Sequence, residues 1–191
     1  MVNPNDLDHV KSSMVCGQCH GIYWISNARE YYSGGFRFQP GEVLNQNKKP
    51  IIPTKLEEQP WLKAPLEKAP TFLSDRFWSD GMVRVTGREY NGLIESPCYQ
   101  SGTLSCLSCH QMHHDKPQSE DMELWLTDQM KEGGYSNEAC YQCHESFRDQ
   151  LTQHTYHAPE SPGSSCYNCH MPHTTYGLLK AVRSHEISSP D

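Results

Sequence analysis

The pentapeptide Cys16-Gly17-Gln18-Cys19-His20 is the first of four copies of one pattern, in which a histidine directly follows the second of two cysteines spaced three apart. The other copies span residues 106–110, 140–144 and 166–170. Two thiols at this spacing lie about one helical turn apart and can form thioethers with the two vinyl groups on one edge of a porphyrin. The adjacent histidine then lies under the ring and binds the iron. Because these copies use eight of the nine cysteines, the sequence predicts four covalently attached c-type haems.

The predicted haem-binding residues are the two cysteines and the proximal histidine of each copy. They are Cys16, Cys19, His20, Cys106, Cys109, His110, Cys140, Cys143, His144, Cys166, Cys169 and His170. Cys98 is the ninth cysteine and has no local partner, so a buried free thiol and a disulfide between chains both stay open.

Other uses of paired cysteines fit this pattern less well. A zinc ribbon does not require a histidine after every second cysteine. A thioredoxin-like motif needs one pair in a βαβ context, not four pairs. A disulfide scaffold is typical of shorter chains, and these pairs are too local for one.

The composition agrees with a core made largely of cofactor. Only 36% of the 191 residues are apolar, which is low for an ordinary core of this size. Four large apolar haem rings would supply the buried apolar surface that the side chains lack. We therefore predict one domain over residues 1–191, mainly α with much irregular structure: a multihaem cytochrome c with short helices around a four-haem core.

The chain divides into three segments, which are residues 1–20 with the first motif, residues 21–100, and residues 101–191 with three motifs. The middle segment contains no histidine and has six prolines between Pro40 and Pro70. Prolines at that density exclude a long helix or a central strand, so we expect an extended belt that wraps the haem core. Its aromatic residues indicate that the belt packs against the rest of the protein.

Local signals predict a helix before the first motif, capped by Asp6. We also expect a strand at 82–86, a turn at Asn91-Gly92, helices at 119–132 and 136–151, a short helix stopped by Pro172, and an irregular tail over 176–190.

The formal charge of −7 argues against nucleic acid and anionic membranes as partners. We expect redox proteins with a basic docking patch, other copies of this chain or other multihaem cytochromes as partners. The sequence contains no transmembrane segment and no signal peptide. Covalent haem attachment is normally completed outside the cytoplasm, so we expect a periplasmic or extracellular prokaryotic protein, seen here as a mature or excised segment of a longer chain.

Seven histidines remain for the sixth coordination site of each iron: His9, His113, His114, His154, His157, His173 and His185. His113 lies three residues after a proximal histidine and therefore on the same helix face. It cannot reach the opposite side of its own porphyrin, so we expect it to bind a neighbouring haem. His154 and His157 form a similar pair, with one or both turned to iron. The sixth ligand of the first haem comes from His9 or from a distant part of the chain; if His9 and His20 lie on one continuous helix they share a face, which favours a distant ligand.

The stretch from residue 77 to the C-terminus resembles a family of tetrahaem cytochromes. The residues that carry the likeness are 77–81, 87–92, 96–99, 106–113, 154–157, 169–172 and 183–185. This family is grouped with the nitrifier tetrahaem cytochrome that accepts electrons from hydroxylamine oxidoreductase, and its members are often fused to tetratricopeptide repeats. The resemblance implies electron transfer, with His113, His154, His157 and His185 as distal ligands. His173 departs from the family pattern. No histidine lies between His20 and His110, so we expect His185 to bind the first haem.

Three functions follow from these observations. The first is electron transfer through four haems with two histidine ligands each, without catalysis. The second is reduction of a small nitrogen compound at one five-coordinate haem. The third is a role as a domain or subunit of a larger cytochrome assembly.

Overall fold

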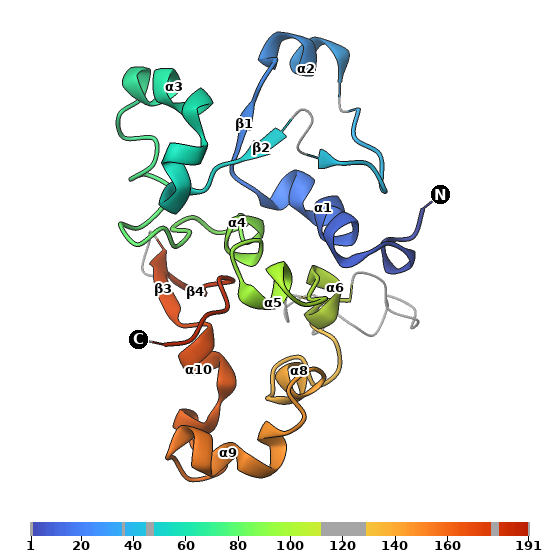
Figure 1. Ribbon diagram of the computed structural model, residues 1–191, viewed down its shortest axis with the longest axis vertical. Coiled ribbons are helices and arrows are strands. Elements are labelled where there is room, and N and C mark those ends of the chain that lie inside the picture. Colours follow the sequence, from blue (N-terminus) through green and yellow to red (C-terminus); the bar gives the residue numbers. More distant parts are fainter. Residues whose placement is uncertain (1, 36, 45–47, 112–128, 177–179, 191) are drawn as a thin grey trace.

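The computed structural model describes residues 2–35, 37–44, 48–111, 129–176 and 180–190, and these form an elongated molecule (Figure 1). Helices α1–α3 occupy one end, α8–α10 the other, and α4–α6 lie between them. The described part of the chain is mainly helical, with short helices and much irregular structure, as predicted.

The α-helices are α1 (His9–His20), α2 (Ala28–Gly34), α3 (Lys63–Lys68), α4 (Tyr90–Leu93), α5 (Pro97–Gln100), α6 (Cys106–Cys109), α8 (Glu138–Tyr141), α9 (Phe147–Thr155) and α10 (Cys166–His170). The 3-10 helices are η1 (Pro4–Asp6), η3 (Pro53–Glu58), η4 (Pro60–Leu62) and η6 (Pro162–Ser164). Two two-stranded antiparallel sheets pair β1 (Tyr23–Ile25) with β2 (Lys48–Pro50), and β3 (His173–Tyr176) with β4 (Lys180–Arg183).

Helix α1 carries the first motif and ends at its histidine, His20. Its N-cap is Asp8, whose carboxylate accepts the backbone N–H of Lys11 at 2.9 Å, and not Asp6 as predicted, which lies in η1. Both aspartates precede the helix, but only Asp8 stands directly before its first residue, where a side chain reaches the unpaired N–H groups. Met14 is buried on the inner face of α1.

The proline-rich stretch is not an extended belt. Pro53 and Pro60 start the 3-10 helices η3 and η4, and Pro65 lies in α3. A proline at the first helical position loses no hydrogen bond, because the N–H there has no helical partner. Two of the six prolines, Pro53 and Pro60, therefore begin short helices here. The expected packing of the aromatic residues is present, since Trp61, Phe72 and Phe77 contact the cluster around Leu62.

Two other local predictions in this segment are wrong. Residues 82–86 form no strand, and only an isolated bridge joins Phe77 to Val83. Asn91 and Gly92 lie inside α4 and do not form a turn between elements. The buried side chain of Asn91 accepts the N–H of Ile22 and donates to the carbonyls of Ile22 and Ile51. This long-range network outweighs the local turn preference of the Asn-Gly pair.

The C-terminal segment is divided more finely than predicted. The helix expected over 136–151 is split into α8 and α9, and Arg148 of α9 donates to both carboxylate oxygens of Glu138 in α8. Helix α10 ends before Pro172, as predicted. The tail is not wholly irregular, because residues 180–183 form β4. The predicted helix at 119–132 lies largely outside the described residues; within it, residues 129–132 are not helical.

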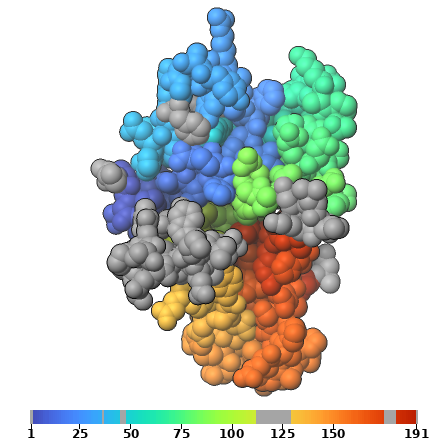
Figure 2. Space-filling model, turned by 180° about the vertical axis from the view of Figure 1, so that it is seen from behind, coloured from blue at the N-terminus to red at the C-terminus, as the bar shows by residue number. Residues whose placement is uncertain are grey.

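Buried apolar side chains are unevenly distributed. One cluster joins Met14, Leu44, Tyr90, Leu93 and Tyr99, and a second joins Ile22, Ile51, Leu62 and Phe77. Within the described part of residues 129–190, the buried hydrophobic side chains are those of two tyrosines, at 141 and 167. Seen from behind, residues 130–170 form the tip of the molecule (Figure 2). No helix in the described ranges is long and apolar enough to cross a membrane.

Candidate haem-binding sites

Each of the four motifs includes a short helix. Helix α1 ends at His20, α6 and α10 begin at Cys106 and Cys166, and α8 contains Cys140. This places the two thiols of a motif about one helical turn apart, as thioether formation requires. All nine cysteines are free thiols, and the second cysteine is exposed in the first, third and fourth motifs.

The motifs adjoin one another in sequence order. Helices α1 and α6 pack together, with the thiols of Cys16 and Cys106 close enough to perturb each other's pKa, and the same holds for the thiols of Cys140 and Cys166, where Cys166 N–H also donates to Asn137 Oδ1 at 2.9 Å. Between these pairs, Gln142 Nε2 donates to the carbonyl of Ser108 at 3.2 Å. The first motif therefore contacts the second, the second the third, and the third the fourth. The thiol contacts lower the pKa of Cys16 and of Cys166 to about 7.

Two pairs of histidine rings lie close together and nearly parallel to each other. The rings of His154 and the proximal His170 are 6.0 Å apart between centres, with 3° between their planes. The rings of His185 and the proximal His110 are 6.4 Å apart, with 16° between their planes. Offset-stacked aromatic rings have centres about 4.5–7 Å apart, so these distances suit stacking as well as ligation of a shared metal ion.

This spacing also suits two axial ligands of a single metal ion. A metal–imidazole bond is about 2 Å long and the ring centre lies roughly 1 Å beyond the nitrogen, so two rings on opposite sides have centres about 6 Å apart. The observed 6.0 and 6.4 Å fit that geometry. The rings thus fit the predicted haem at the second and fourth motifs, each with one proximal and one distal histidine.

The second nitrogen of several histidines is held by the protein. His170 Nδ1 lies 2.7 Å from the carbonyl oxygen of Ser188, and His185 Nδ1 lies 3.1 Å from that of Arg183. A carbonyl oxygen only accepts, so Nδ1 carries the proton in both rings and Nε2 keeps its lone pair. This is the tautomer and orientation that a metal-ligating histidine needs.

His20 has a different partner. Its Nδ1 donates to the carboxylate of Glu89 at 3.4 Å, and this contact raises the pKa of His20. Burial of Glu89 would raise the pKa of its carboxyl group, but His20 and backbone N–H groups including that of Gly87 outweigh burial and lower it to about 2. Arg88 donates to the carbonyl of Cys19 at 2.9 Å, so this segment contacts the first motif twice.

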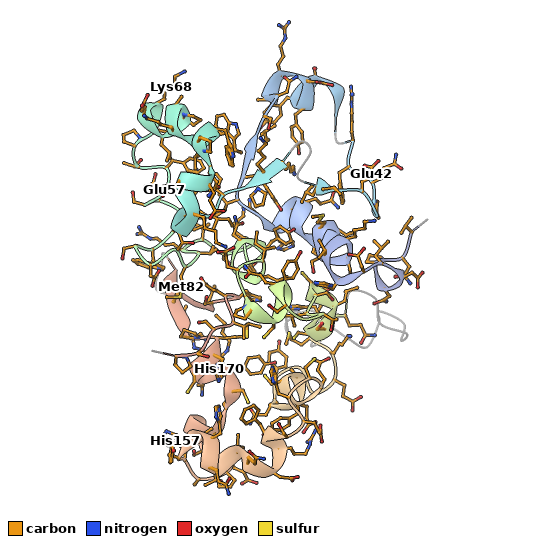
Figure 3. All side chains as sticks on the ribbon, viewed as in Figure 1. Glu42, Glu57, Lys68, Met82, His157 and His170 are labelled. Atoms are coloured by element: carbon orange, nitrogen blue, oxygen red, sulfur yellow. The ribbon has the colours of Figure 1, made fainter. Side chains whose placement is uncertain are left out.

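The distal ligands suggested by the sequence are only partly brought together. His154 faces the fourth motif, and His185 faces His110 of the second motif instead of His20 of the first, where we expected it. His157 is exposed in the same end of the molecule as His170 (Figure 3). His113 lies outside the described residues. His9 shares α1 with His20, as expected, and its Nε2 contacts the carbonyl of Tyr99 at 3.1 Å.

Sequence reasoning missed the groups that hold the histidines. Two are backbone carbonyls, of Arg183 and Ser188, which any residue type supplies and no sequence pattern marks. The third, Glu89, lies within the stretch 87–92 that carries the family resemblance, but it is 69 residues from His20 in the sequence. Only the fold brings the two together.

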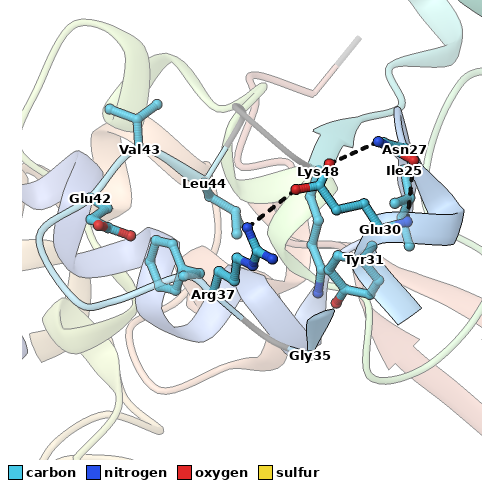
Figure 4. Close-up of a pocket in the computed structure, with 11 residues that line it drawn as sticks. Ile25, Asn27, Glu30, Tyr31, Gly35, Arg37, Glu42, Val43, Leu44 and Lys48 are labelled. Carbon is cyan, nitrogen blue, oxygen red and sulfur yellow. Dashed lines mark hydrogen bonds and ion pairs between the residues drawn. The ribbon is translucent and has the colours of Figure 1, made fainter. Parts of the chain in front are cut away.

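A separate small pocket lies between α2 and β2 and includes Tyr31, Arg37 and Lys48 (Figure 4). Its volume is about 100 Å³. Ligand pockets for organic molecules usually measure about 300–1,000 Å³. The Arg37–Glu30 ion pair also occupies one wall. This pocket is therefore too small to hold a haem.

Comparisons with known proteins returned no matching family model, no similar curated protein and no similar solved structure. The described residues bring together no group of three or more His, Cys, Asp or Glu side chains of the kind that a zinc site uses.

Proposed function

We propose that this protein transfers electrons through four covalently bound c-type haems. The observation that carries the proposal is the pairing of parallel imidazoles, His154 with His170 and His185 with His110, beside two of the four motifs. When bound, a haem iron takes up and releases one electron at a time. The cysteines of each motif would fix a ring covalently, and its histidine would supply the proximal ligand.

The chain itself holds the ligand histidines in position before a haem binds. The carbonyls of Ser188 and Arg183 fix the tautomers of His170 and His185, so both rings keep Nε2 ready for a metal. Filled axial sites exclude substrate from an iron, which favours electron transfer over catalysis. Ligation by two histidines without methionine favours low reduction potentials.

The row of adjoining motifs supports transfer along the molecule. Contacts between neighbouring motifs keep their helices at hydrogen-bonding distance, so cofactors bound there would lie close together. The order from the first to the fourth motif suggests a continuous path between the two ends of the molecule.

Reduction of a small nitrogen compound at one open haem is the second candidate. The observation that favours it concerns His20, whose side chain is 59% exposed. Within the described part of the chain, no second histidine ring faces it as His154 faces His170. A five-coordinate iron at the first motif would be open to a small ligand.

Electron paramagnetic resonance of the oxidised protein distinguishes the two functions. The electron-transfer proposal expects low-spin signals that account for all four haems. A high-spin signal that integrates to one haem and changes when hydroxylamine or nitrite is added would support the enzyme and contradict the carrier.

The remaining parts of the proposal concern location and partners. Covalent haem attachment is completed outside the cytoplasm, which supports a periplasmic or extracellular protein. The net charge of −7 favours redox partners with a basic docking surface. Other multihaem cytochromes, including further copies of this chain in a larger assembly, remain within the proposal.

A further inference from the structure

The environment of His20 differs from that of the other motif histidines with a known Nδ1 partner. His170, like the distal His185, donates Nδ1–H to a neutral backbone carbonyl. His20 donates to a carboxylate, that of Glu89. His20 therefore has a negatively charged partner where His170 has a neutral one, although the nearby guanidinium of Arg88 offsets part of that charge.

Glu89 is held in this place by several contacts. Its side chain is only 30% exposed. The second carboxylate oxygen accepts the backbone N–H of Gly87 at 2.8 Å. Gly87 adopts φ of 74°, a conformation that favours glycine, and thereby turns its N–H toward the carboxylate. On the other side of Glu89, buried α4 begins and anchors the segment.

A carboxylate that accepts the second N–H of an axial imidazole makes that imidazole a stronger donor to iron. A stronger donor and a nearby negative charge both stabilise the oxidised iron relative to the reduced iron, because oxidation adds positive charge at the metal. A partly buried carboxylate is screened less by solvent than a surface one, which strengthens the effect.

We propose that Glu89 orients His20 and lowers the reduction potential of the haem at the first motif below that of the haem at the fourth motif, whose ligand His170 has a neutral partner. This inference rests on the proposed function, since it needs a haem on Cys16 and Cys19. It gives the row of motifs a direction, because an electron entering at the first motif would pass to a haem of higher potential at the fourth. Glu89 acts through His20 and is a positioning residue.

The test is a spectroelectrochemical titration of the four-haem protein and of Glu89→Gln. Glutamine keeps the size and an acceptor oxygen but removes the charge. The expected result is that the potential of the first haem moves upward most, that of the second haem moves less because its distal ligand His185 lies near Glu89, and the two other potentials and the low-spin fraction stay unchanged. Glu145→Gln is the matched control: it removes the same charge one residue from His144, but Glu145 pairs with Arg148. It should leave all four potentials in place.

Two further measurements keep the outcomes distinct. Glu89→Asp retains the charge. The potential of the first haem in Glu89→Asp should therefore lie closer to the wild-type value than the same potential in Glu89→Gln. If the glutamine variant fails to load haem, the wild type alone decides, since four coincident potentials would overturn the inference. Equal potentials in the wild type and a fully loaded Glu89→Gln would also overturn it, and both results would leave electron transfer intact. A chain without covalent haem would instead refute the proposed function.

Discussion

The two ends of this molecule are built on different principles. Residues 2–111 contain nine of the buried hydrophobic side chains in the described chain, among them Ile51 and Leu62, which are 0% and 2% exposed. Residues 129–190 contain only two, both tyrosines. Both parts carry two motifs each, yet only the first has an apolar core made of its own side chains.

This difference indicates what each part needs in order to stay folded. Ordering a residue costs about 1–2 kcal/mol of backbone entropy, and buried apolar surface normally offsets it. The C-terminal part has little such surface and relies on hydrogen bonds such as those of Asn137 to Ser164 and Cys166. The proposed haems would supply both the apolar surface and cross-links between chain segments. The N-terminal part depends on them less.

Loss of the fourth haem is expected to have the largest effect. In the double variant Cys166→Ser and Cys169→Ser, the cross-link between α10 and α9 through His154 is lost with the ring. Hydrogen exchange should show the free energy of local opening falling toward zero across residues 137–176, while α4 and α5 keep their protection.

The control for this variant is Cys98→Ser, which removes the one cysteine outside the motifs. It should retain four haems and the wild-type exchange pattern in both parts. A double variant whose C-terminal part stays as protected as the wild type would show that the tyrosines and hydrogen bonds suffice there.

Removal of one distal ligand is expected to have the next largest effect. His154→Ala and His185→Ala should each convert a single haem from low spin to high spin, because each ring faces one proximal histidine. Electron paramagnetic resonance measures the fraction converted, about one quarter in each variant if four haems are bound.

His9→Ala is the matched control for the ligand variants. The Nε2 of His9 is already used by the carbonyl of Tyr99, so its loss should leave every haem low spin. If His154→Ala and His185→Ala both keep four unchanged low-spin haems, these two histidines are not iron ligands.

Shortening one side chain in the N-terminal core should destabilise the protein without changing haem binding. Leu62→Ala leaves a cavity beside Ile51 and Phe77 and should lower the free energy of unfolding by about 2–5 kcal/mol, measured by denaturant titration. Haem content and spin state should not change. Leu56→Ala, at a site 38% exposed in the same segment, should cost within about 0.5 kcal/mol. Equal losses in the two variants would mean that the Leu62 cluster is not a stabilising core.

Release of the C-terminal tail should have the smallest effect. The hydroxyl of buried Ser96 donates to the carbonyl of His185 and accepts the N–H of Ile187, both at 2.8 Å. Ser96→Ala leaves both groups unpaired and should destabilise the tail by about 1–3 kcal/mol. The amide of Ile187 should then exchange faster, whereas exposed Ser101→Ala should not change it.

The sequence predicted the features that depend on short-range spacing. The helix before Cys16 and the stop at Pro172 both depend on neighbours within one or two helical turns, whereas the continuous helix expected through the third motif is interrupted after Tyr141. The role of the prolines was misread, because a proline that breaks one helix also starts another, and η3 and η4 show the second use.

The features missed depend on contacts between distant segments. His185 faces His110 because Ser96 and Gly92 bind the tail near α4: a Cβ on Gly92 would lie 2.8 Å from the backbone nitrogen of Glu186. The close approach of the tail to residue 92 requires a glycine there, and no local pattern in the tail predicts it. The pairing of Glu89 with His20 has the same cause.

The most direct test of the account is the intact mass of the mature protein, purified from a host with a c-type haem attachment system and measured under denaturing conditions that remove non-covalent ligands. The account predicts one species that carries four haem adducts, and loss of a single adduct when Cys16 and Cys19 are both replaced by serine. A chain without covalent adducts, or one that retains only zinc under native conditions, would contradict it.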